Sequence, residues 1–256
     1  MLKKRIIPKL LIKIQNINNT TFPVCVTTKE FKDANLVGDP ISQGKILEAQ
    51  KVDEIFLINY RKYNFNKDNF YFNFLKEFST NIFLPLTVGG NISSIKDIEM
   101  HLKNGAEKVC LNTITGNNLN FLKESSKIFG KQCIVVSIDF KKERDIFFNC
   151  GKDKIKKNII DWSKQLEDLG VGEIVLNDID RDGKMSGLNL KIAKKVSDVV
   201  KVPVILSGGC GLAEHFIEAF KKTNIQGISA STYFSFKDQN FEQVRSQVIN
   251  QNIPLR

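Results

Sequence analysis

Eight short apolar runs, separated by longer amphipathic segments, constrain the fold of this chain more than any other feature. They lie at residues 5–11, 54–59, 84–90, 108–113, 133–140, 173–180, 202–209 and 227–232. Near-continuous apolar runs of this length favour strands buried on both faces of a parallel sheet. Eight strands, each followed by a helix, within 256 residues predict an α/β fold with a single (β/α)8 TIM barrel. A doubly wound sheet is the alternative, but it usually needs fewer strands or a second domain.

The sequence repeats itself between its two halves. PLTVGGN at 85–91 resembles PVILSGGC at 203–210, and a short polar pair follows each Gly pair at the same distance of 23 residues, from 89 to 112 and from 208 to 231. This predicts one domain, residues 1–256, built from half-barrels at about 1–125 and 126–256. LIK at 11–13 then aligns with DFK at 139–141, so that one half carries Asp139 where the other carries Leu11.

Composition and charge argue against several classes of protein. No stretch approaches the roughly 20 apolar residues that cross a bilayer, and Lys9 and Lys13 interrupt the apolar start, so we expect a cytoplasmic protein without a signal peptide or membrane contact. The net charge of +10 is spread along the chain, which favours a lysine-rich surface suited to anionic substrates over nucleic-acid binding. Five scattered cysteines and two histidines argue against disulfides and a metal site, and we expect no cofactor.

The segment between the first two apolar runs, residues 14–39, is long and polar. Loops of that length are more often functional lids than plain connectors. The alternative is a solvated insertion that contains a small hairpin around FPVCVTT.

Glycine pairs end two of the apolar runs, at Gly89–Gly90 and Gly208–Gly209. Glycines between a strand and a helix let backbone N–H groups approach a phosphate closely. The next strand in each half ends in a small polar pair, Asn112–Thr113 or Ala230–Ser231. The repeated spacing predicts two phosphate sites on opposite sides of the barrel mouth, which suit a ligand with a phosphate at each end. Tight turns without a ligand are the alternative.

Acidic residues follow two of the later strands. Asp139 ends an apolar run, so its carboxylate is expected to face the mouth as a general acid or base, or else to accept hydrogen bonds from a loop. Asp178, Asp180 and Asp182 alternate toward one side of strand six and its loop. No partner cluster or EF-hand glycine pattern accompanies them, which favours a loop that orders a ligand over a cation site.

Motifs spread along almost the whole chain match one known family. They include RIIP, GDP, TVGG, GAEKV.LNT, GEI.L..IDRDG..SG and P.I.SGG.G..EHF.EAF. With them the chain resembles HisF, the cyclase subunit of imidazole glycerol phosphate synthase. The resemblance implies a lyase-type synthase subunit that forms a heterodimer with a glutaminase (HisH-like) partner and receives ammonia through its barrel. In that family two opposed aspartates, at the ends of strands one and five, close an imidazole ring on a bis-phosphorylated substrate.

The barrel mouth, where the family carries out its chemistry, departs from the family pattern. The strand-five aspartate matches Asp139, but the strand-one aspartate falls on Leu11, which cannot transfer a proton. Five other family positions are also changed. They fall on Asn59, Asn91, Asn177, Asp178 and, for the lid lysine, Thr27. The phosphate-binding positions that match the family are Gly90, Asn112, Thr113, Asp182, Gly183, Gly209, Ala230 and Ser231.

The opposite end of the barrel matches the family without a change. There the family gates its ammonia entrance with a ring of charges, whose positions fall on Arg5, Glu54, Lys108 and Glu173. Buried charges are tolerated when they are paired, and these four balance as two pairs. We refer to these four residues as the charge ring.

The residues of the ammonia entrance match the family, whereas those of the barrel mouth are changed. This combination indicates a changed substrate. A HisF-like branch with Leu at the strand-one position is associated with sugar amidation for bacterial surface glycans, where ammonia passes to a separate amidotransferase that makes an acetamidino sugar. The first interpretation is therefore an ammonia-channelling subunit for such amidation that holds a phosphorylated small molecule. The alternatives are a working histidine-pathway cyclase, in which another group replaces the aspartate, and a non-catalytic scaffold for a glutaminase.

Overall fold

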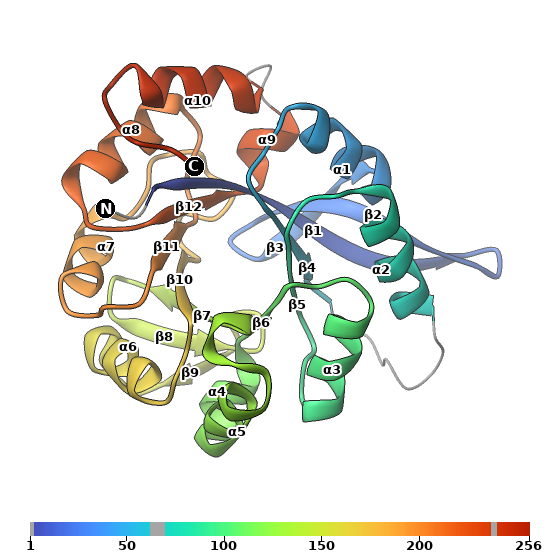
Figure 1. The fold of residues 1–256 in the computed structure, drawn as a ribbon, viewed down its shortest axis with the longest axis horizontal. Helices are drawn as coiled ribbons and strands as arrows, with labels where there is room; N and C mark the ends of the chain where they lie inside the picture. The colour runs from blue at the N-terminus through green and yellow to red at the C-terminus, as the bar shows by residue number, and fades with distance from the viewer. Residues whose placement is uncertain (1–2, 62–69, 237–239) are drawn as a thin grey trace.

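The computed structural model describes residues 3–61, 70–236 and 240–256, and its centre is a closed barrel of parallel strands (Figure 1). Around the barrel the strands are β1 (Arg5–Ile17), β4 (Ile55–Asn59), β5 (Leu86–Gly89), β6 (Lys108–Leu111), β7 (Ile134–Lys141), β10 (Glu173–Asp178), β11 (Val204–Ser207) and β12 (Gly227–Ala230). β12 pairs in parallel with β1 and closes the ring. The predicted (β/α)8 barrel is confirmed.

Helices alternate with these strands and cover the outside of the barrel (Figure 1). They are α1 (Pro40–Ala49), α2 (Phe70–Asn81), α3 (Ile95–Lys103), α4 (Thr113–Asn117), α5 (Leu119–Phe129), the short 3-10 helix η1 (Lys131–Cys133), α6 (Ile159–Asp168), α7 (Leu190–Ser197), α8 (Ala213–Lys222), α9 (Thr232–Phe236) and α10 (Phe241–Ile249). Ser94 caps α3 by accepting a hydrogen bond from the Asp97 amide. None of the described helices combines the length and apolarity needed to span a membrane.

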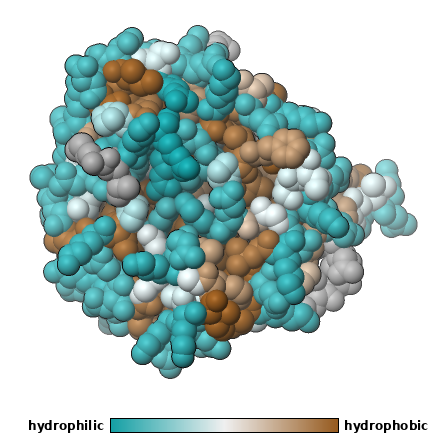
Figure 2. Space-filling model, in the orientation of Figure 1, coloured by the Kyte–Doolittle hydropathy of each residue, from teal (hydrophilic) through white to brown (hydrophobic). Residues whose placement is uncertain are grey.

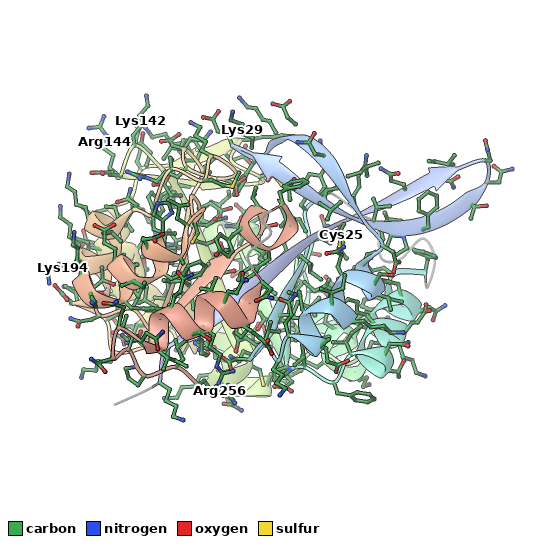
Figure 3. All side chains as sticks on the ribbon, turned by 90° about the horizontal axis from the view of Figure 1, so that it is seen from above. Cys25, Lys29, Lys142, Arg144, Lys194 and Arg256 are labelled. Carbon is green, nitrogen blue, oxygen red and sulfur yellow. The ribbon has the colours of Figure 1, made fainter. Side chains whose placement is uncertain are left out.

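The first strand is longer than its apolar run. β1 continues past Leu11 to Ile17 because β2 (Thr20–Lys29) pairs antiparallel with this second half of the strand. β3 (Lys32–Gly38) then pairs antiparallel with β2. The segment read as a long polar loop is therefore a three-stranded ribbon, and Figure 3 shows it projecting beyond the barrel. Closure of this ribbon as a lid stays a prediction.

The fifth barrel strand carries a similar but shorter addition. β8 (Asp145–Phe148) pairs antiparallel with the end of β7, and β9 (Asp153–Ile155) pairs with β8. The strands that begin the two predicted half-barrels thus both run on beyond the barrel as antiparallel ribbons.

The interior of the barrel is layered along the strands. Successive side chains of a strand point to opposite faces, so Arg5, Ile7, Lys9 and Leu11 of β1 share one side. Arg5 contacts charged residues of other strands, whereas Ile7 belongs to an inner apolar cluster distinct from the larger core. Two residues further along, Lys9 contacts a serine of β11. Charged, apolar and polar layers therefore succeed one another toward the mouth.

Candidate active site

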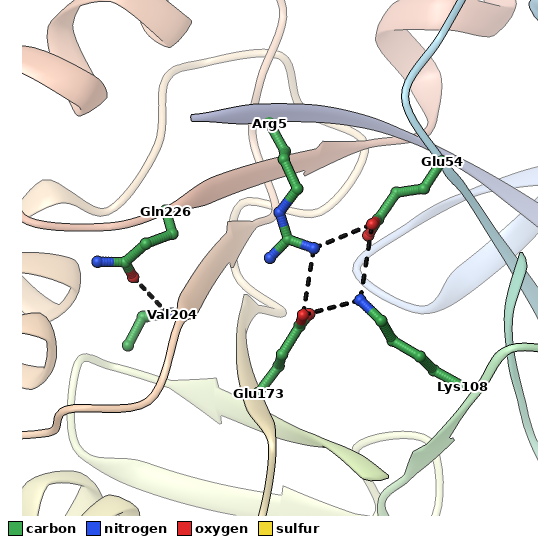
Figure 4. Close-up of polar contacts among 6 residues, drawn as sticks. All are labelled: Arg5, Glu54, Lys108, Glu173, Val204 and Gln226. Carbon is green, nitrogen blue, oxygen red and sulfur yellow. Dashed lines mark hydrogen bonds and ion pairs between the residues drawn. The ribbon is translucent and has the colours of Figure 1, made fainter. Parts of the chain in front are cut away.

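The four residues of the charge ring meet at the amino ends of the strands (Figure 4). An Nη of Arg5 lies 2.9 Å from an oxygen of Glu54 and 3.2 Å from one of Glu173. Nζ of Lys108 lies 2.8 Å from the same Glu173 oxygen and 3.6 Å from the Glu54 oxygen. Cations and carboxylates thus alternate around a square, and each charge faces two of opposite sign.

This square is buried enough for its pairing to matter. The side chains of Arg5 and Glu54 are 8% and 2% exposed, and those of Lys108 and Glu173 are 20% and 12% exposed. Burial alone would lower the pKa of Arg5, but the carboxylates of Glu54 and Glu173 outweigh it and raise that pKa. The arrangement therefore stabilises Arg5 in its charged form. One oxygen of Glu54 and one of Glu173 have no partner among the described residues.

An apolar layer lies directly above the charge ring inside the barrel. It consists of Ile7, Phe56, Cys110, Val135, Val175 and Ile205, all at most 8% exposed, with the partly buried Ile58 packed against it. Burial raises the pKa of the Cys110 thiol to about 12, so it stays protonated at neutral pH. This layer solvates charges poorly and separates the charge ring from the polar groups of the mouth.

Asp139, near the end of β7, is the buried carboxylate of the polar layer and is 7% exposed. One of its oxygens accepts hydrogen bonds from Ser137 Oγ at 2.9 Å and Asn177 Nδ2 at 3.2 Å, and the other accepts one from Asn112 Nδ2 at 3.2 Å. Burial raises the pKa of Asp139 to about 6, although these hydrogen bonds and the charge of Lys9 act in the opposite direction. A carboxyl with such a pKa exchanges its proton readily near neutral pH.

Leu11 occupies the corresponding place on β1. It is 8% exposed and pairs with Ile58 of β4 on one side and Val26 of β2 on the other. A side chain among these neighbours supplies no proton donor or acceptor. The structure therefore places one titratable carboxyl, Asp139, and one hydrocarbon at the two strand ends that the sequence repeat aligns.

Lys9 is a polar group of the interior that the sequence analysis missed. It is 8% exposed, and its Nζ donates a hydrogen bond to Ser207 Oγ of β11 at 2.8 Å. In the sequence, Lys9 stands out only as an interruption of an apolar run. The period of two along β1 was the available signal, because a residue four positions after the inward-facing Arg5 also faces inward.

The first predicted phosphate site is partly engaged in contacts within the protein. Asn112 donates to Asp139 and, at 3.0 Å, to the carbonyl of Ser137. Thr113 Oγ1 accepts a hydrogen bond from the Asn149 amide at 3.1 Å. Gly90 has a positive φ of 100°, and a Cβ there would lie 2.0 Å from the Asn59 carbonyl, so close backbone packing already requires this glycine. Phosphate binding at this side stays a prediction.

The residues of the second predicted phosphate site line a pocket. Gly209, Ala230 and Ser231 lie on its wall with Gly208, Cys210 and Thr232, and Lys9, Ser207 and Ser229 come from the barrel interior. Asp182 and Gly183 also line it. Gly209 has φ of 99°, and a Cβ there would meet the Gly187 carbonyl at 2.3 Å, so this glycine too is required by packing. The structure brings all five predicted residues of this side together.

Asp182 and Gly183 also attach the β2–β3 ribbon to the barrel. An oxygen of Asp182 accepts a hydrogen bond from Thr28 Oγ1 at 2.7 Å, and its carbonyl accepts one from the Glu30 amide at 3.1 Å. Glu30 forms an ion pair with Lys184. Asp182 therefore also holds the ribbon against the loop after β10. Gly183 packs closely against the ribbon, because a Cβ there would lie 2.0 Å from the Thr28 carbonyl oxygen.

The acidic loop is not arranged as a cation site. Asp178 accepts a hydrogen bond from Asn189 Nδ2 at 2.8 Å, and Asp180 accepts one from the Lys142 amide at 2.7 Å. Together with the contact of Asp182 to the ribbon, each of the three carboxylates has a different protein partner. Across residues 3–61, 70–236 and 240–256, no group of three or more His, Cys, Asp or Glu side chains is placed to hold a metal ion.

Comparison with known proteins gives consistent results along the full chain. The profile of the family described as "Histidine biosynthesis protein" matches residues 11–239. An imidazole glycerol phosphate synthase subunit HisF from Hydrogenobaculum sp. (strain Y04AAS1) is 37% identical over 260 residues, covering 100% of both chains. A relative from Prochlorococcus marinus (strain MIT 9313), provisionally named imidazole glycerol phosphate synthase subunit hisF2, is 36% identical and covers 100% of this chain and 99% of its own. A HisF subunit from Methanococcus vannielii is 33% identical with 100% of both chains covered.

Proposed function

The chain belongs to the HisF family of histidine biosynthesis proteins, and from this premise we propose that it is a synthase subunit that receives ammonia from a glutaminase and delivers it at the barrel mouth. We propose further that its substrate is not that of the histidine pathway. The delivered ammonia serves amidation of a bacterial surface sugar, with a separate amidotransferase making the acetamidino group.

One observation carries the change of substrate: Leu11 at the end of β1. Ring closure by a pair of opposed acid–base groups needs a proton-transferring side chain on each side of the mouth, and general acid–base groups contribute about 10²–10⁴-fold in rate each. Asp139 supplies one, whereas Leu11 lies among Ile58 and Val26 and supplies none. A subunit that only delivers ammonia does not need the second group.

The layering of the barrel supports ammonia transfer along its axis. The charge ring holds ionised groups at one end, and the apolar layer above it disfavours a charged ammonium ion far more than neutral ammonia. A path of this composition suits ammonia that is released in neutral form by a docked partner and kept away from bulk water.

The amino-terminal end of the barrel also offers a surface for such a partner. Phe83, which precedes β5, is 82% exposed, and Ile46 in the last turn of α1 is 50% exposed. The Phe83 amide donates a hydrogen bond to Glu48 at 2.6 Å, which places the two segments together. Figure 2 shows separate hydrophobic patches within the largely hydrophilic surface of the face in view. Exposed aromatic and aliphatic side chains of this kind fit a glutaminase interface.

The opposite end of the molecule carries basic side chains that suit a phosphorylated ligand. In Figure 3, Lys29, Lys142 and Arg144 lie along one edge of the molecule, opposite Arg256. Lys29 ends β2, and the other two residues occupy the turn between β7 and β8. Positive charge around a mouth raises the local concentration of anionic substrates.

A working cyclase of the histidine pathway is the second candidate, and the full-length similarity to HisF subunits favours it. In that case Asp139, with a pKa raised to about 6, acts as one acid–base group and a different residue replaces the second. A non-catalytic scaffold for a glutaminase is the third candidate, and it needs neither group.

The deciding experiment is turnover of the histidine-pathway cyclase substrate by the purified protein with saturating ammonium. Free ammonium removes the need for a partner, so the assay reports on the barrel mouth alone. We expect no imidazole glycerol phosphate, and its formation at a rate typical of enzymes would disprove the change of substrate.

A second experiment separates delivery from scaffolding. The chain is co-expressed with a glutaminase subunit from the same genome, and glutamine-dependent transfer of ammonia to the sugar acceptor by the separate amidotransferase is measured. Glutamine-dependent product supports delivery. A stable complex with active glutaminase but no transfer would favour the scaffold.

A further inference from the structure

Lys9 is a buried cation without a carboxylate partner. None of the ion pairs between described residues includes it. A lysine Nζ offers three hydrogen-bond donors, and among the described residues its one hydrogen bond to a side chain goes to the neutral Ser207 Oγ at 2.8 Å. An ammonium group in such surroundings is costly unless an anion compensates it, so its retention in the barrel interior calls for an explanation.

Asp139 does not provide that compensation through direct contact. Its two oxygens bond to Ser137, Asn177 and Asn112, and its charge reaches Lys9 only through space. The charge ring lies on the far side of the apolar layer and is already balanced within itself. The remaining surroundings of Lys9 are those of the pocket at the ends of β11 and β12.

A second buried polar group faces the same pocket. Ser229 of β12 is 0% exposed, lines the pocket, and its Oγ has no hydrogen-bond partner among the described residues. Buried hydroxyl groups are nearly always hydrogen-bonded, so an unpaired one beside a cation points to a ligand. Ser207 completes the inner side of the pocket, while Gly209 and Ser231 lie on its outer wall.

We infer that Lys9 Nζ and Ser229 Oγ bind the phosphate of a phosphomonoester held at the ends of β11 and β12, and that Lys9 contacts it from inside the barrel. This inference rests on the phosphate site of the proposed function and adds its inner ligands. A phosphate dianion accepts hydrogen bonds on several oxygens, so it compensates the Lys9 charge and satisfies the Ser229 hydroxyl together. The charge of Lys9 then selects a dianionic group over a neutral one such as an unphosphorylated sugar.

The test is a calorimetric titration of the purified full chain with inorganic phosphate, comparing Lys9→Met with the unchanged protein. A charge-assisted hydrogen bond within a buried site predicts about 10- to 100-fold weaker phosphate binding in Lys9→Met. Ser229→Ala, which removes a neutral donor, is expected to weaken binding about 3- to 10-fold. Lys13→Met is the matched control, because it removes the same charge from the same strand outside the pocket, and it is expected to change binding less than twofold.

Thermal unfolding separates a ligand-binding role from a purely structural one. Phosphate is expected to raise the Tm of the unchanged protein and of Lys13→Met, and to raise that of Lys9→Met less at the same phosphate concentration. Without phosphate, the Tm of Lys9→Met is expected to be unchanged or higher because a buried unpaired charge is gone. A lower Tm of Lys9→Met with unchanged phosphate affinity would overturn the inference. If Lys9→Met fails to fold, Ser229→Ala decides the question, and unchanged phosphate affinity in that variant overturns the inference.

The outcomes also distinguish this inference from the proposed function. Phosphate binding that is equal in Lys9→Met and the unchanged protein refutes the inner ligands and leaves ammonia delivery intact. An unchanged protein that binds no phosphate refutes both the inference and the phosphorylated ligand of the proposed function.

Discussion

The strands that begin the two half-barrels, β1 and β7, share their architecture and differ in their chemistry. Both cross the barrel and run on into antiparallel ribbons. On β7, Ser137 hydrogen-bonds to Asp139 two residues later and helps to hold a titratable carboxylate at the mouth. On β1 the aligned positions are Lys9 and Leu11, so the charge is positive and lies deeper in the barrel.

The two strands therefore present different chemical groups at aligned positions. A pair of acids at both strand ends would act on the two sides of one substrate. An acid on one side and a deeper cation on the other instead suit a mouth in which one half handles protons and the other holds negative charge. The amino-terminal end of the barrel shows no such division, because the charge ring draws on both halves and remains balanced.

The largest expected effect comes from restoring the symmetry of the strand ends. Leu11→Asp places a carboxyl opposite Asp139, and we expect turnover of the histidine-pathway substrate with saturating ammonium to rise by about 100-fold or more over the unchanged protein. The measurement is the rate of imidazole glycerol phosphate formation. Leu11→Asn is the control, since it adds polarity without a proton-transferring group. An equal gain in both variants would mean that shape or polarity, and not acid–base chemistry, separates the two strands.

The second-largest expected effect concerns the charge ring at the amino ends of the barrel strands. Lys108→Glu puts a third carboxylate beside Glu54 and Glu173, leaving Arg5 as the one cation of the ring. Breaking a buried ion pair costs roughly 3–5 kcal/mol, and we expect the lower part of this range because the Lys108 side chain is 20% exposed. Denaturant unfolding measures this loss of stability.

The same substitution tests the role of the charge ring in ammonia delivery. In a complex with the glutaminase, Lys108→Glu is expected to uncouple glutamine hydrolysis from transfer of ammonia, while activity with free ammonium is retained. Lys103→Glu on the surface of α3 is the control, because its partner Glu99 is exposed and the pair contributes little. Unimpaired coupling in Lys108→Glu would remove the charge ring from the ammonia path.

The third effect is a pH dependence that originates on β7 alone. The pKa of Asp139 is raised from 3.8 to about 6 by burial, so the folded state holds this proton between pH 4 and 6 while the unfolded state releases it. Stability contributed by this group is therefore present below pH 4 and is lost as the pH rises to 6. The shift of about two units corresponds to roughly 3 kcal/mol at most.

Asp139→Asn removes this dependence, since the amide stays neutral. We expect the variant to match the unchanged protein at pH 4 and to exceed it by up to about 3 kcal/mol at pH 7, less whatever the lost hydrogen bonds to the carboxylate contributed. Urea unfolding at pH 4, 5, 6 and 7 measures the difference. If the difference in unfolding free energy between Asp139→Asn and the unchanged protein does not grow with pH, Asp139 is ionised at little cost and burial does not control its pKa.

The barrel was predictable from sequence because its strands are buried on both faces and therefore read as apolar runs. The extension of β1 to Ile17 was not, because its antiparallel partner is β2 and its residues from Lys13 onward are half-exposed or exposed. The contact of Asp182 with Thr28 was equally hidden, since 154 residues separate the two. Local patterns report which face a residue takes, but they do not report its distant partners.

The candidate site shows the same limit. Gly90 and Gly209 were singled out for phosphate binding, yet neighbouring backbone already excludes a side chain at both positions. Asp139 was found because an acid at the end of an apolar run stands out. Lys9 was overlooked because a lysine inside an apolar run is taken for an interruption of the strand. Its inward orientation follows only once Arg5 is known to face the barrel interior, since the two residues lie on the same side of β1.

The smallest effect measures how each strand influences the carboxyl of Asp139. Ser137 and Asn177 lower its pKa through hydrogen bonds, and Lys9 lowers it to a smaller extent through its charge. A neutral hydrogen bond of about 0.5–1.5 kcal/mol predicts that Ser137→Ala raises the pKa by about 0.4–1 unit. Lys9→Met is expected to raise it by less than Ser137→Ala does. Carbon-detected NMR titration of the Asp139 carboxyl gives both shifts, with Lys13→Met as the variant that should leave this pKa unchanged. A larger pKa shift of Asp139 in Lys9→Met than in Ser137→Ala would contradict this prediction. The carboxyl on β7 would then depend more on the cation of β1 than on its neighbour within β7.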